Sequence, residues 1–89
     1  MSEFAIIDSL FRRLLPVLHD VFSASEIVEV SEFVEVGEYG LALDAVIDIF
    51  VEEGKAPADD VIVLAELLAT AMELPTAEYS ERLRAAGRK

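Results

Sequence analysis

Few residues of this 89-residue chain belong to types that carry out catalysis, and their spacing does not bring them together. His19 is the only imidazole, there is no cysteine, and no serine has a base suggested by its spacing. Nucleophilic catalysis requires such a base within hydrogen-bond reach. Asp44 and Asp48 could present two carboxylates to a divalent cation, but calcium takes about six to eight oxygen ligands. We therefore expect no enzyme, no cofactor and no metal site.

One short motif suggests a different chemistry. Asp8, Ser9 and Leu10 match the D-S-L core around the phosphopantetheine-bearing serine of acyl carrier proteins, which are also small, acidic and four-helical. In that family the serine opens the second helix, whereas Ser9 lies inside the first helical pattern of this chain. The position argues against a carrier-protein role, which stays as a minor alternative.

The charge of the chain restricts its partners. Seven Lys and Arg stand against 18 Asp and Glu, which gives a formal net charge of −11 at pH 7. Binding to nucleic acid or to anionic lipid needs a basic patch, because neutralised phosphates supply much of the affinity. The basic residues cluster only at the C-terminal end, at Arg82, Arg84, Arg88 and Lys89. The sequence therefore predicts no direct contact with nucleic acid and no membrane binding.

The acidic residues form a long run of one sign. Between Leu14 and Gly54 there are ten acidic residues and no basic residue. Such a run can simply keep an apolar domain soluble, and 54% of this chain is hydrophobic. Alternatively, it can form a surface complementary to a basic protein, because a field of one sign accelerates association with a partner of the opposite sign.

Hydrophobic periodicity predicts helices along nearly the whole chain. Ser23 and Glu26 have the spacing of a capping box at the start of a helix. Gly37 and Gly54 are placed to end helices, because glycine readily adopts the left-handed conformation. The predicted helices cover about residues 3–22, with a kink at Pro16, and residues 24–36, 39–53, 57–73 and 76–86.

These elements predict an all-α fold: a compact, four-helix bundle-like single domain over residues 1–89, with a short basic tail helix. The longest apolar run, Val61 to Ala65, is far shorter than the roughly 20 residues of a membrane-spanning helix. We see no signal peptide, and the absence of cysteine suits a reducing compartment, so we expect a cytoplasmic protein. Helix 57–73 is apolar on almost every side, which places it at the centre of the bundle or against a second copy in a homodimer.

The central segment resembles a known family. Residues 33–44 read F-V-E-V-G-E-Y-G-L-A-L-D and are similar to the G-E-Y-G-x-A-L core of the MafI family of immunity proteins. The resemblance extends over roughly residues 26–74. It implies a small bacterial protein that protects the cell by binding a cognate polymorphic secreted toxin. A nuclease is a frequent target of this family, and its basic groove would suit an acidic partner.

We interpret the motif residues as structural. Gly37 permits the chain reversal, Glu38 favours the start of the next helix, and Gly40 allows a neighbouring backbone to approach closely. Tyr39 can bury its ring while its hydroxyl finds a partner. Ala42 and Leu43 belong to the buried face. The toxin-binding site should then lie on exposed acidic positions, for which we select Glu29, Glu32, Glu35, Asp44, Asp48 and Glu52.

Two functional hypotheses follow. The first is an immunity protein that occludes the active site or the substrate groove of a toxin domain. The second is an acidic homo-oligomeric adaptor or structural module, whose charge only confers solubility.

Overall fold

The computed structural model describes residues 3–88, which form helices joined by short turns and contain no strand. The all-α class predicted from the sequence is therefore confirmed for this part of the chain. The radius of gyration is 12.0 Å, close to the value of about 12 Å expected for a compact chain of this length. The helices are α1 (Glu3–Leu18), α2 (Ala24–Glu35), α3 (Tyr39–Glu53), α4 (Asp59–Ala71) and α5 (Thr76–Ala86).

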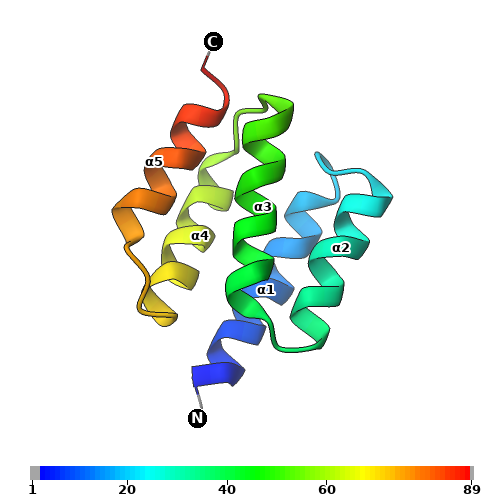
Figure 1. Cartoon of the computed structure of the whole chain (residues 1–89), viewed down its shortest axis with the longest axis vertical. Coiled ribbons are helices and arrows are strands. Elements are labelled where there is room, and N and C mark those ends of the chain that lie inside the picture. The colour runs from blue at the N-terminus through cyan, green and yellow to red at the C-terminus, as the bar shows by residue number, and fades with distance from the viewer. Residues whose placement is uncertain (1–2, 89) are drawn as a thin grey trace.

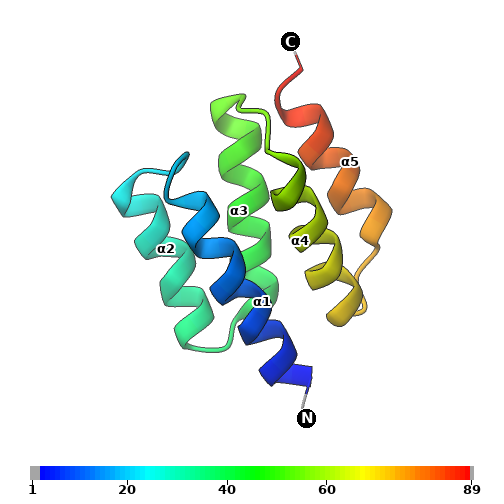
Figure 2. The same cartoon turned by 180° about the vertical axis from the view of Figure 1, so that it is seen from behind.

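The five helices surround one core as a closed ring. Helix α1 packs against α2, α2 against α3, α3 against α5, α5 against α4, and α4 again against α1. Figure 1 shows α3 in front, between α2 and α5, and Figure 2 shows α1 and α4 on the opposite side. Every helix thus has at least two neighbours. Since isolated helices of this length are marginal in water, this mutual packing stabilises them.

Helix α5 completes this ring, so it is not the peripheral tail that the sequence suggested. Leu83 is fully buried and Ala86 is nearly so. Beyond the helix, Gly87 lies directly against the α3–α4 loop, where an added Cβ would come within 2.7 Å of the Ala56 Cα. The expectation of a tail was wrong because Leu83 and Ala86 lie on one face of α5, which gives this otherwise polar helix an apolar stripe.

The core combines side chains from all five helices. Phe11 of α1 and Phe50 of α3 are its largest buried members, and Phe50 packs against Phe22 with ring centroids 5.1 Å apart. The buried side chains of α4 are all apolar. The other fully buried large side chains are Leu14, Leu18, Val30, Leu43, Val46, Ile47, Val61, Leu68 and Leu83.

Three helices end in the same way. After α2, α3 and α4, one residue adopts a left-handed conformation: Gly37 (φ 77°), Gly54 (φ 64°) and Glu73 (φ 57°). The N–H of the following residue then donates to a carbonyl five residues back, as in Leu74 N to Ala69 O at 2.8 Å. This hydrogen bond is part of the Schellman motif, which satisfies the last carbonyls of a helix. Glu73 is the one non-glycine residue with positive φ in the described chain.

Two predicted helices differ from the structure by two or more residues at an end, while the predicted helix 24–36 ends one residue earlier, at Glu35. Helix α1 runs through Pro16 but ends at Leu18, not at residue 22. The chain leaves the helix there because Ser23 must be extended (φ −68°, ψ 163°) to cap α2. Helix α4 covers Asp59–Ala71 where we predicted 57–73, because Ala58 is extended at its start and the Schellman turn follows Ala71.

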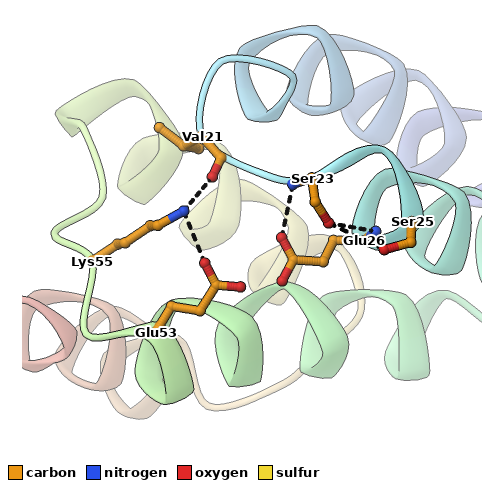
Figure 3. A network of polar contacts seen from close by, with 6 residues as sticks. All are labelled: Val21, Ser23, Ser25, Glu26, Glu53 and Lys55. Carbon is orange, nitrogen blue, oxygen red and sulfur yellow. Dashed lines mark hydrogen bonds and ion pairs between the residues drawn. The ribbon is translucent and has the colours of Figure 1, made fainter.

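A polar network joins the two loops at one end of the molecule (Figure 3). The Ser23 hydroxyl accepts from the Glu26 N–H at 3.2 Å, and Glu26 accepts from the Ser23 N–H at 2.8 Å, which completes the predicted capping box. Lys55 donates to the Val21 carbonyl at 2.7 Å and pairs with Glu53 at 2.8 Å. The ammonium group therefore connects the α1–α2 loop to the end of α3.

Candidate protein-binding groove between α2 and α3

A groove of about 360 Å³ runs along the outer face of α3, beside α2. Phe33 of α2 and three residues of α3 form its apolar part: Leu41, Ala45 and Ile49. The α3 residues that line it recur at spacings of three and four, so they lie on one side of the helix. Because of this apolar strip, the surface can bind a partner through hydrophobic contacts as well as through charge.

Carboxylates border the apolar strip on both helices. Glu29 comes from α2, and Asp44, Asp48 and Glu52 come from α3. The capping box starts α2 in a register that presents Glu29, while Gly54 ends α3 just after Glu52. Four of the six acidic residues selected from the sequence therefore line one groove. Its chemistry is that of a binding surface for cationic and apolar side chains.

Asp44 is already engaged by the C-terminal helix. It is half-buried, and its Oδ1 accepts a hydrogen bond from the Tyr79 hydroxyl at 3.1 Å. Burial raises the pKa of Tyr79, and the Asp44 charge raises it further, because both disfavour a phenolate. Asp44 therefore holds α5 in place, and its oxygens are only partly free to receive a partner.

Asp48 is engaged by the same helix. Arg82 donates to Asp48 Oδ1 at 2.9 Å, and both side chains remain about half exposed. An exposed ion pair of this kind contributes up to about 1 kcal/mol and is easily exchanged for another cation. Arg82 thus shows how a guanidinium group binds the edge of the groove, and it lowers the negative charge there.

Glu29 and Glu52 are the unengaged acids of the groove. Both are exposed, and in residues 3–88 neither side chain forms a hydrogen bond or an ion pair. Glu32 and Glu35 are also exposed, but neither lines the groove. Glu35 instead lies in the field of Arg12, whose pKa is raised first by its 2.7 Å contact with Asp8 and further by Glu35.

The G-E-Y-G residues lie at the start of α3, on another side of that helix. Gly37 has the positive φ of a chain reversal, while Glu38 precedes α3 without a capping hydrogen bond from its side chain. The half-buried Tyr39 ring stacks on Phe11, with centroids 5.9 Å apart. Ala42 and Leu43 are fully buried in the core.

Gly40 does not have the role we predicted. A Cβ built on Gly40 would meet nothing within 4 Å, and its φ is not positive. No neighbouring backbone of residues 3–88 therefore approaches it closely. The prediction was wrong because the outer side of the first turn of α3 is open.

Sequence reasoning missed two components of this region. Phe33, Leu41 and Ile49 were not recognised as parts of a groove. Tyr79 and Arg82 were assigned to a tail, although their spacing of three residues places both on one side of a helix. That spacing was the available signal, but it does not reveal which helix they face.

No group of three or more His, Cys, Asp or Glu side chains in residues 3–88 is placed to hold a metal ion. None of the helices in this part of the chain is long and apolar enough to cross a membrane.

No protein-family model, curated protein or solved structure matches this chain.

Proposed function

We propose that this chain is an immunity protein that binds a cognate bacterial toxin domain through the α2–α3 groove. The observation that carries the proposal is the groove itself, in which an apolar strip is bordered by four carboxylates from two helices. A basic toxin surface would place cationic groups against these carboxylates and apolar side chains along Phe33 and Leu41. Binding would neutralise the toxin by covering its active site or substrate groove.

The proposed partner is basic because of charge complementarity. The net charge of −11 repels phosphates and attracts a cationic domain, so a nuclease with a nucleic-acid groove is a suitable target. The protein would act as a competitor for that groove, with no enzymatic activity, cofactor or direct nucleic-acid contact of its own. We place this activity in the cytoplasm of the protected cell.

The MafI-like segment supports the same proposal. The similarity covers roughly residues 26–74, which include most of α2 and all of α3 and α4, and therefore both sides of the groove. We propose that α1–α4 form the four-helix platform of a MafI-like protein. Helix α5 would be an addition that covers Asp44 and Asp48 and leaves Glu29 and Glu52 for the toxin.

Two charge reversals on one helix test the proposal. Glu29→Lys places a cation in the groove, whereas Glu32→Lys makes the same charge change one turn away, outside its lining. The partner to test is the C-terminal domain of a secreted toxin encoded beside this gene, where there is one, and calorimetry gives Kd over a salt series. We expect Glu29→Lys to raise Kd at least tenfold and Glu32→Lys to raise it less than threefold.

The outcomes test two questions separately: whether the chain binds the toxin, and whether it does so through the groove. Tight binding with equal effects of the two variants would keep immunity but remove the groove as its site. Absence of binding by the unmodified chain would reject immunity for that toxin. Binding that weakens as salt rises would assign a role to the carboxylates.

A homo-oligomeric adaptor is the second candidate, and the outer side of α4 favours it. Val63 and Leu67 lie one turn apart there and are 53% and 44% exposed. Two copies would bury these side chains together, although each copy carries a charge of −11, which opposes association. Light scattering at low and high salt tests this candidate, because screening should favour a dimer. A monomer under both conditions would reject it.

A further inference from the structure

A second hollow is lined by residues from the start of α1, the start of α3, and the ends of α2 and α4 with the turns that follow them. These helix ends lie at the bottom of Figures 1 and 2. We call this hollow the end hollow. It has a volume of about 300 Å³, and the lining residues that matter here are Glu3, Phe4, Glu38, Tyr39, Gly40 and Glu73.

An exposed aromatic ring forms one wall of the end hollow. Phe4 is 69% exposed, although its ring lies beside Tyr39 with centroids 6.3 Å apart. Tyr39 in turn stacks on the buried Phe11 ring. The inner rings are therefore held by the core, while the Phe4 ring presents apolar and π surface to the outside.

Three carboxylates from three different segments line the end hollow together with this ring: Glu3, Glu38 and Glu73. None of them takes part in an ion pair of residues 3–88, and the nearby Arg12 is held by Asp8. The partial charges of the helix ends offset each other, because two helices begin and two end here. The carboxylates therefore make the end hollow negative.

Gly40 lies at the rim of the end hollow and has no side chain that could cover it. Its φ does not require glycine, and nothing lies within 4 Å of the position of a Cβ. Glycine is unfavourable in a helix interior, and at this second position of α3 it does not improve the packing of this chain. What the missing side chain provides is access from outside to the Tyr39 and Phe4 rings.

We propose that the end hollow is a second docking surface, which receives an arginine side chain of a partner protein. The guanidinium group would lie over the Phe4 ring and donate to the surrounding carboxylates. Arginine fits better than lysine, because its planar fork stacks on aromatic faces while it donates several hydrogen bonds. Tyr39 and Leu41 point in directions about 200° apart on α3, so this surface is separate from the α2–α3 groove.

A small cationic probe tests this proposal on the full chain. The probe is the blocked tripeptide acetyl-Gly-Arg-Gly-amide, and its neutral control carries citrulline, which has nearly the same shape, in place of arginine. Binding is followed by NMR as shifts of the Gly37 and Gly40 amides and of the Phe4 ring. We expect saturable shifts at these residues, with an affinity at least fivefold higher for the arginine peptide.

Two variants separate docking from stability. Gly40→Gln should weaken binding at least fivefold while Tm stays the same or rises, because the new side chain meets nothing in this chain. The matched control Val63→Gln, on the outer side of α4, should leave the affinity within twofold. Phe4→Ala gives an independent test by removing the exposed ring, and it should also weaken binding at least fivefold.

Three results would overturn the proposal: shifts confined to the α2–α3 groove, equal affinity for the citrulline peptide, or equal effects of Gly40→Gln and Val63→Gln. The experiment does not involve a toxin. A failure here therefore leaves the proposed function standing, and a failure of toxin binding leaves this result standing.

Discussion

At the scale of single residues, Glu73 is the position at which local conformation and residue type disagree. Gly37 and Gly54 occupy the equivalent place after α2 and α3, where the left-handed conformation is freely accessible to glycine. Glu73 adopts the same conformation with a side chain. A left-handed residue that is not glycine costs about 1–2 kcal/mol. The chain therefore retains a carboxylate at the end hollow at the expense of stability.

Replacing this residue should stabilise the protein. Glu73→Gly removes the left-handed strain, and the greater freedom of glycine in the unfolded chain takes back about 0.4–1 kcal/mol of that gain. We expect a net stabilisation of about 0.5–1 kcal/mol and a Tm higher by about 4 °C, measured by circular dichroism. Glu73→Gln is the matched control, because it removes the charge and keeps the strain. An equal rise in Tm for both variants would assign the effect to charge.

Individual side-chain roles were predictable from sequence only where they depend on near neighbours. Gly37 was assigned correctly to a chain reversal, since a helix end is set by the residues next to it. Gly40 was misjudged, because its surroundings depend on which helices pack beside α3. The engagement of Asp44 by Tyr79 depends on a contact across 35 residues, and spacing along the chain carries no information about it.

At the scale of helices and loops, the same distinction holds. The capping box of Ser23 and Glu26 was visible in the sequence because its two residues are one turn apart. The Lys55 contact with Val21 spans 34 residues and was not predictable. It joins two loops that the capping box alone leaves independent (Figure 3).

This loop network makes stability depend on pH through Glu26. The facing Glu53 carboxyl lowers the pKa of Glu26, and the Ser23 N–H, the Ser23 hydroxyl and Lys55 lower it further. A carboxyl whose pKa is lower in the folded state stabilises the fold above its ordinary pKa of about 4.5, and this contribution is lost as pH falls. Glu26→Gln retains a side chain that can complete the capping box but cannot ionise.

Urea unfolding of both proteins between pH 7 and pH 3 measures this contribution. We expect the wild type to be more stable than Glu26→Gln at neutral pH, with the difference shrinking between roughly pH 5 and pH 3. Glu32→Gln is the matched control, since its side chain lies on the same helix outside the network and forms no hydrogen bond in residues 3–88. A difference that stays constant over this range would show that the Glu26 charge does not stabilise the fold.

At the scale of the whole molecule, the acidic run and the ring of helices are linked by α5. Arg82 and Arg84 of α5 do not belong to a separate tail. Arg82 lies against Asp48, and Arg84 lies 3.7 Å from Glu66 of α4. The packing of α5 thus places cations beside acidic residues of α3 and α4. The all-α class was predictable from periodicity, but the position of α5 was not, because its average hydrophobicity is low and only its buried stripe directs its packing.

If α5 is part of one cooperative core, a change in its buried stripe must destabilise the entire fold. Leu83→Ala removes a fully buried side chain, for which the usual cost is about 2–5 kcal/mol. Arg84→Ala is the matched control, because its exposed ion pair contributes up to about 1 kcal/mol. Urea unfolding followed by circular dichroism and by the methyl signals of Leu14 in α1 should shift to the same lower midpoint in Leu83→Ala. A Leu14 transition that keeps its wild-type midpoint would mean that α1–α4 fold without α5. In that case the platform of four helices would be independent, and α5 would be free to leave Asp44 and Asp48 when a partner binds.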